Sequence, residues 1–120
     1  MPISEKTYRK IALEDPSGNW ELYCGVLRQK PDMTVEHNFI GSRLFTRLRQ
    51  QLDESEWDVR FNAGRVRRSA ENYFIPDVYV IPMDLIRPLR RRPNALEAYS
   101  GPLPLVVEVW SRPQATTTSR

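Results

Sequence analysis

Two carboxylates stand inside strongly apolar segments of the chain. Asp77 interrupts the run FIPDVYVIP at residues 74–82, and Glu108 lies within LVVEVW at residues 105–110. Charged side chains are seldom buried unless they are paired or bind a metal, so both acids need a partner. If they leave two neighbouring strands, they form an oxygen-only site that suits Mg²⁺ or Mn²⁺. Such an ion can hold a phosphodiester and lower the pKa of a bound water for in-line attack.

A structural interpretation of the same acids stays open. Asp77 can accept backbone N–H bonds close to Pro76, and Glu108 can pair with an arginine. The chain has one cysteine and one histidine, too few for a typical zinc site. The sequence therefore favours a hard divalent cation if the acids bind a metal at all.

Arginine supplies 15 of the 18 positive charges, and the net charge is +3. Guanidinium groups bind phosphate in a bidentate manner, so the cluster of Arg90, Arg91 and Arg92 can follow a DNA backbone. Runs of charge are also common in loops that only face water. We expect DNA as a partner because a nuclease-like site would itself require an anionic substrate.

The acids depend on the elements that carry them. The best-defined element is a helix over residues 34–52, capped by Asp32 or Thr34, whose apolar stripe packs on a sheet. Residues 73–81 and 105–110 predict two strands that are apolar on both faces and lie side by side at the sheet centre. The other expected elements are a lid-like helix or turn within residues 1–18, one strand at 20–27, a hairpin of strands 57–61 and 65–68, an arginine-rich connection at 86–93 and a helical turn at 96–99.

Length and composition limit the class of protein. A chain of 120 residues with 40% hydrophobic residues predicts one domain. No segment reaches the ~20 apolar residues of a membrane span, and the charged N-terminus does not resemble a signal peptide. A single cysteine, Cys24, cannot form an internal disulfide. We expect a cytoplasmic protein with no membrane partner, and we leave open whether it forms a homodimer.

The order of these motifs resembles a known family. Pro76-Asp77, followed after 30 residues by Glu108-Val109-Trp110, is similar to the PD-(D/E)XK nuclease motif. More closely, the successive segments WELYCGVL, Val35-Glu36-His37, FIPDVYVIP and YSGPLPLVVEVWS resemble the Uma family of restriction endonuclease-like proteins over roughly residues 5–112. The resemblance implies an α/β fold with a restriction-endonuclease-like mixed β-sheet and a long helix packed on it. We assign residues 1–112 to this domain and expect residues 113–120 to be a disordered tail.

The resemblance also implies roles for individual residues. Asp77 and Glu108 become ligands of Mg²⁺ (or Mn²⁺), with the Val109 carbonyl as a third ligand. His37 and Glu36 open the long helix and can add a further acid or a proton relay. Both also have structural interpretations, His37 as a core or cap residue and Glu36 as an acid of the first helical turn.

Trp110 departs from the motif, because it occupies the position of the motif lysine. Family members generally take this lysine from a following helix, so we expect the fold to be C-terminally incomplete. The expected function is a metal-dependent endonuclease-like protein acting on DNA phosphodiester bonds, weakly active or inactive without the lysine. The alternative is a non-catalytic nucleic-acid-binding module or degenerate nuclease remnant. A purely structural domain would instead need arginines to engage both acids.

Overall fold

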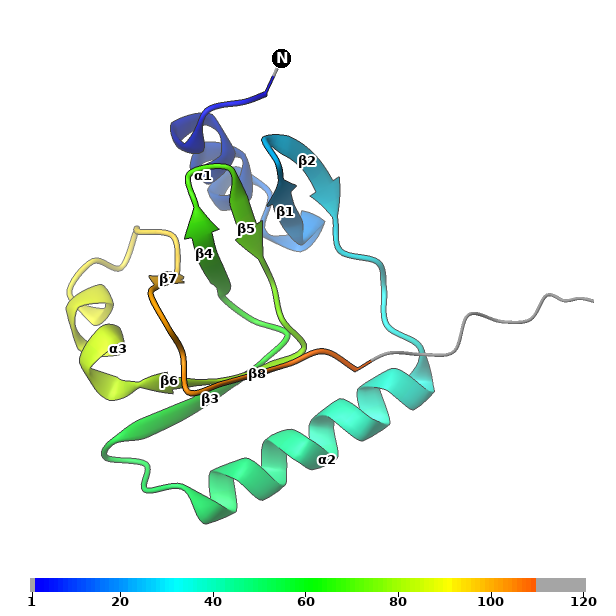
Figure 1. The fold of residues 1–120 in the computed structure, drawn as a ribbon, viewed down its shortest axis with the longest axis vertical. Coiled ribbons are helices and arrows are strands. Elements are labelled where there is room, and N and C mark those ends of the chain that lie inside the picture. Colours follow the sequence, from blue (N-terminus) through cyan, green and yellow to red (C-terminus); the bar gives the residue numbers. More distant parts are fainter. Residues whose placement is uncertain (1, 110–120) are drawn as a thin grey trace, which may run out of the picture.

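The computed structural model describes residues 2–109, which form two β-sheets and three α-helices (Figure 1). One sheet has five strands in the order β2-β1-β5-β4-β7, and the other has three in the order β3-β6-β8. Neighbouring strands are antiparallel except β4 and β7, which are parallel. The expected mixed α/β fold is confirmed, with its strands divided between two sheets.

The five-stranded sheet packs against the N-terminal helix α1, Glu5–Glu14. Tyr8 and Ala12 of this helix are buried with Leu22 and Tyr73 of the sheet. The Tyr8 hydroxyl donates a hydrogen bond of 2.7 Å to the Trp20 carbonyl oxygen. The helix is therefore part of the core, and the expectation of a lid is wrong. The strands of this sheet are β1 Trp20–Tyr23, β2 Val26–Gln29, β4 Arg65–Ser69, β5 Asn72–Phe74 and β7 Ala98–Ser100.

The three-stranded sheet carries the long helix α2, Val35–Gln51, on one face (Figure 1). Its strands are β3 Trp57–Phe61, β6 Val78–Pro82 and β8 Leu105–Val107. Val78 and Val80 of the central strand belong to the cluster that α2 covers. Tyr79 and Ile81 join a second cluster that includes Ile86 of helix α3, Met83–Arg90. Strand β6 is thus covered on both faces, as its apolar sequence predicts.

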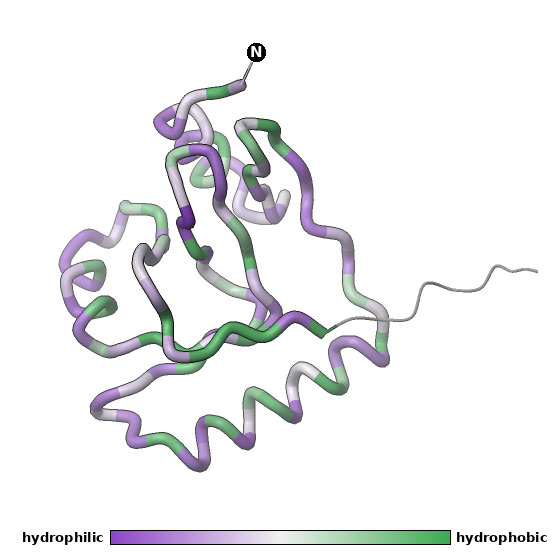
Figure 2. Tube along the Cα trace, viewed as in Figure 1, coloured by the Kyte–Doolittle hydropathy of each residue, from purple (hydrophilic) through white to green (hydrophobic). Residues whose placement is uncertain are grey.

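Helix α2 begins where the sequence predicts. The Thr34 side chain caps it by accepting the His37 backbone N–H at 3.1 Å. Hydrophobic and hydrophilic residues alternate along the helix (Figure 2), and Leu44 and Leu48 pack on the sheet. Ile40, whose spacing from Leu44 and Leu48 places it on the same apolar stripe, is 44% exposed. The large apolar side chains of α2 that pack on the sheet, Leu44, Phe45 and Leu48, therefore lie in the C-terminal half of the helix.

The chain changes sheets at two turns that the sequence analysis missed. Strands β3 and β4 follow each other but belong to different sheets, so the expected hairpin at Asn62-Ala63-Gly64 is wrong. The expected single strand at 73–81 is also broken, because β5 ends at Phe74 and β6 begins at Val78. The two turns are joined, since the Asn62 N–H donates to the Asp77 carbonyl oxygen at 2.8 Å. This break places Asp77 between the two sheets.

Three further elements differ from the expectations. Residues 20–27 form a hairpin, because Cys24 and Gly25 both have positive φ (49° and 79°), as a tight two-residue turn requires. The expected connection at 86–93 lies largely within helix α3, and the expected helical turn at 96–99 overlaps strand β7, which pairs with β4. Strand β8 lies at the sheet edge with Val106 45% exposed, although it is adjacent to β6 as predicted. Within residues 2–109, no helix is long and apolar enough to cross a membrane.

Candidate active site

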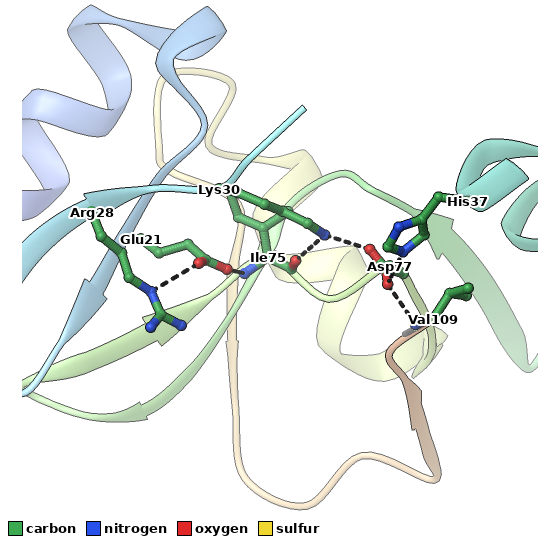
Figure 3. Close-up of polar contacts among 7 residues, drawn as sticks. All are labelled: Glu21, Arg28, Lys30, His37, Ile75, Asp77 and Val109. Carbon is green, nitrogen blue, oxygen red and sulfur yellow. Dashed lines mark hydrogen bonds and ion pairs between the residues drawn. The ribbon is translucent and has the colours of Figure 1, made fainter. Parts of the chain in front are cut away.

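Asp77 is the centre of a hydrogen-bonded cluster at the junction of the two sheets (Figure 3). Its side chain is only 2% exposed. Oδ1 accepts the Lys30 ammonium at 2.8 Å, and Oδ2 accepts the Val109 backbone N–H at 2.6 Å. His37 Nε2 lies 3.0 Å from the same Oδ2. The acid that the sequence singled out is therefore buried and partnered by three separate segments of the chain.

The partners keep Asp77 ionised despite its burial. Desolvation on its own would raise the pKa of this carboxyl, because it disfavours the charged form. Hydrogen bonds from Lys30, the Val109 N–H and His37, together with the Lys30 charge, outweigh it and hold the pKa of Asp77 below its ordinary value. Asp77 is therefore a carboxylate at neutral pH, and both of its oxygens are engaged by groups of the protein.

Lys30 enters the site from the segment after β2. Its Nζ donates to Asp77 and also to the Ile75 carbonyl oxygen at 2.6 Å (Figure 3). The side chain is 11% exposed, so this lysine is nearly buried. It was not among the predicted site residues. The one signal in the sequence was its rarity, because Lys30 is one of three lysines and the only one outside the N-terminal helix.

His37 is brought to the site by the start of α2. The Thr34 cap fixes the first turn, and the ring extends from it toward Asp77 (Figure 3). The expected contact between this histidine and the site is thus present. Its neighbour Glu36 is exposed and does not line the cavity described below.

Glu108 is exposed and follows β8, so its expected position within a strand covered on both faces is wrong; it faces the same cavity as Asp77. This cavity has a volume of about 850 Å³, and Lys30, His37 and Val109 also line it. Partial desolvation raises the pKa of Glu108, and the negative charge of Asp77 raises it further. Among residues 2–109, no ion pair to Glu108 is formed. The two acids therefore differ: one is fully partnered, and the other has no counter-ion within the described part of the chain.

A second buried carboxylate, that of Glu21, is linked to the Asp77 cluster through Ile75. Glu21 is 7% exposed, and its Oε2 accepts the Ile75 N–H at 2.8 Å. Its Oε1 accepts the Arg28 guanidinium at 3.2 Å. The peptide groups of Ile75 thus connect the two acids, since the N–H binds Glu21 and the carbonyl binds Lys30 (Figure 3). Glu21 was not predicted as a site residue, because WELYCGVL has the pattern of one ordinary strand.

The donor set fits a hard divalent cation. Asp77 and Glu108 supply carboxylate oxygens to one cavity, and Mg²⁺ commonly binds one or two carboxylates while keeping several waters. The Lys30 ammonium already places positive charge 2.8 Å from Asp77 Oδ1. A ready cluster of three or more Asp, Glu, His or Cys ligands is absent from residues 2–109. Glu21 also lines the cavity, but its oxygens accept hydrogen bonds from Ile75 and Arg28, so an ion here would rely mainly on Asp77, Glu108 and water.

The remaining predicted site residues lie elsewhere or contact the site differently. Val109 meets Asp77 through its N–H, while the expected role of its carbonyl as a ligand stays a prediction. Arg90, Arg91 and Arg92 are exposed at the end of α3 and do not line the cavity. Two arginines, Arg28 and Arg68, line the cavity, and Arg28 was not among the predicted binding residues. Trp110 and the tail at 113–120 lie outside the described residues.

Comparison with known proteins gives one family. The sequence model of Uma2, described as "Putative restriction endonuclease", matches residues 6–120. No curated protein and no solved structure matches the chain. The family match spans nearly the whole sequence and includes the Asp77 and Glu108 segments. The chain therefore belongs to the Uma2 family, which the description associates with restriction endonucleases.

Proposed function

We propose that this protein is a metal-dependent, endonuclease-like hydrolase of DNA phosphodiester bonds, with Asp77 and Glu108 as ligands of Mg²⁺ or Mn²⁺. The observation that carries the proposal is that a buried ionised acid and a second acid with a raised pKa face one cavity. Membership of a restriction endonuclease family supports the same chemistry. Desolvation and then the charge of Asp77 raise the pKa of Glu108, and a cation bound between the two acids would favour its ionised form.

The residues that line the cavity would have different roles in the reaction. Asp77 is fixed in position by Lys30, His37 and Val109. Its side chain would therefore lose little conformational freedom when it binds a cation. Glu108 supplies the second negative charge. A divalent ion bound between them would polarise a phosphoryl oxygen and lower the pKa of an attacking water. His37 lies close enough to take part in proton movement at Asp77 Oδ2.

Basic groups beside the cavity suit an anionic polymer. Arg28 and Arg68 line it, and both residues are exposed on the surface. We propose that they contact the phosphates next to the scissile one, and that Arg90, Arg91 and Arg92 contribute a more distant contact. DNA as the partner and a cytoplasmic location are parts of this proposal.

A second function is favoured by one observation. Both oxygens of Asp77 already have partners, and this arrangement would be stable without metal. The protein would then be a non-catalytic nucleic-acid-binding module in which Lys30 neutralises Asp77. The two functions differ in whether divalent metal enters the site.

The deciding experiment is nicking of supercoiled plasmid with Mg²⁺ or Mn²⁺. We expect metal-dependent conversion to open circles, reduced about 100-fold or more by Asp77→Asn or Glu108→Gln. Glu54→Gln is the matched control, because Glu54 is exposed and lies outside the cavity. DNA binding without nicking, unaffected by metal, would instead support the binding module.

A further inference from the structure

Lys30 is the only lysine whose side chain is largely withdrawn from water in the described part of the chain. The other two, Lys6 and Lys10, are exposed on helix α1. Burying an ammonium group is costly unless it is paired and hydrogen-bonded, and surface positions were open to this residue type. Its position beside Asp77 and facing the cavity therefore points to a role beyond solubility.

The donors of Lys30 are only partly used. An ammonium has three N–H donors, and Ile75 and Asp77 take two of them. Among residues 2–109, Nζ forms no third hydrogen bond. Lys30 lines the cavity together with Glu108, so its remaining donor is available to a bound molecule there.

We propose that Lys30 is the cationic catalytic residue of this site, and this inference rests on the proposed function. The nuclease motif places its lysine two residues after the second acid, where this chain has Trp110. Lys30 brings the same charge to the first acid from a different segment, the one that follows β2. Lys30 thus provides, from a different part of the chain, the positive charge that the motif would take from a lysine at position 110.

The chemical role of Lys30 is electrostatic and involves no proton transfer from its side chain. During hydrolysis a water oxygen forms a bond to phosphorus, and the bond from phosphorus to the leaving oxygen breaks. The attacking water loses a proton to solvent, and the leaving oxygen takes one from solvent, so a phosphomonoester and a hydroxyl result. Lys30 would donate a hydrogen bond to the attacking water or to a non-bridging phosphoryl oxygen as negative charge develops.

Lys30 and the metal would also compete for the same carboxylate. The ammonium lies 2.8 Å from Asp77 Oδ1, where a divalent cation would also bind. Like charges a few Å apart repel, so bound metal should push Lys30 away from Asp77 toward the cavity. Removing the ammonium should then tighten metal binding while slowing hydrolysis. A lysine that only stabilises the fold would not produce tighter metal binding together with slower hydrolysis when it is replaced.

The experiment compares wild type with Lys30→Met and with Lys6→Met as the matched control. Calorimetric titration measures Mn²⁺ affinity, and plasmid nicking is measured at saturating Mn²⁺. We expect Lys30→Met to bind Mn²⁺ about tenfold more tightly and to nick about 100-fold more slowly. Lys6→Met should match wild type in both. Thermal unfolding checks that each variant is folded.

The outcomes of this comparison separate the two proposals. If neither wild type nor Lys30→Met binds Mn²⁺, the proposed function fails and this inference fails with it. If wild type binds Mn²⁺ and Lys30→Met has the same affinity, only the role of Lys30 is wrong. Wild type that binds Mn²⁺ but never nicks DNA would overturn both the proposed hydrolase function and that role.

Lys30→Arg provides a second test if Lys30→Met does not fold. It keeps the charge, but its planar guanidinium cannot place a donor where the ammonium does. We expect Mn²⁺ affinity within about threefold of wild type and nicking slowed at least about tenfold. An unchanged nicking rate would contradict the assignment.

Discussion

Lys30 and Asp77 are 47 residues apart in the chain, yet their charged groups meet at 2.8 Å between the two sheets. Their side chains are 11% and 2% exposed, so the pair is largely withdrawn from water. Removing one partner of a buried pair leaves the other charge unpaired, which costs more than the pair contributes. The stability of the junction and the chemistry of the site therefore depend on the same contact.

Asp77→Ala should lower the free energy of unfolding by about 3 kcal/mol, because it leaves the Lys30 ammonium buried without its counter-ion. Urea denaturation monitored by tryptophan fluorescence measures this loss. Combining Asp77→Ala with Lys30→Met should cost less than the sum of the single changes, since no unpaired charge remains. Strict additivity would mean that the two groups do not interact.

The contribution of Asp77 to stability should depend on pH in the acid range. Its folded-state pKa lies below the ordinary value of 3.8, so the unfolded chain binds the proton more readily than the folded one. The stabilisation is therefore present above about pH 4 and is lost as the pH falls through the folded-state pKa. The difference in urea midpoint between wild type and Asp77→Asn should shrink on acidification. A difference that grows would show that the sign is wrong.

Glu108→Gln should raise the thermal midpoint in the absence of metal. The pKa of Glu108 is raised above its ordinary value of 4.5, so its ionisation is harder in the folded state than in the unfolded state. The folded state therefore loses stability as the pH rises from the unfolded-state pKa of Glu108 through its folded-state pKa. Neutral Gln at this position avoids the loss.

The same variant should lose the increase in thermal midpoint that Mn²⁺ gives to wild type, because one of two carboxylate ligands is gone. Thermal scans with and without Mn²⁺ measure both effects. A variant that is less stable without metal, yet still stabilised by it, would remove Glu108 from the site.

Local sequence patterns predicted the helix at 34–52 and the central strand after Asp77. The Thr34 cap and the apolar positions at Leu44 and Leu48 encode α2 locally, and β6 is apolar on both faces because both faces are covered. The same patterns could not show that β3 and β4 belong to different sheets. Asn62 and Gly64 suit a hairpin, but here their positive φ values turn the chain toward the second sheet.

The candidate site was predicted only in part, for a related reason. Asp77 stood out because an acid in an apolar run needs a partner, and His37 lies one helical turn from a recognisable cap. Lys30 and Glu21 carried no such local signal. Both reach the site through the Ile75 peptide, which lies at the break between β5 and β6. That break depends on long-range packing, so the partners of Asp77 could not be identified from spacing alone.

Neutralising Arg90, Arg91 and Arg92 together should weaken DNA binding without changing Mn²⁺ affinity, because these residues do not line the cavity. The slope of log affinity against log salt should flatten by about 0.9 for each phosphate that the variant no longer binds. Fluorescence anisotropy over a salt series provides the measurement. The matched variant Arg68→Gln, at the cavity, should reduce both binding and nicking. An unchanged slope for the triple variant would mean that these arginines only face water.

The central claim is that Asp77 and Glu108 together hold a divalent cation, and calorimetric titration with Mn²⁺ tests it most directly. The account predicts saturable binding of one ion by wild type and by Glu54→Gln, and its loss in Asp77→Asn and in Glu108→Gln. Thermal unfolding of the same samples would establish that the variants are folded. Binding that persists in both folded acid variants, or no binding by the wild-type protein, would contradict the account.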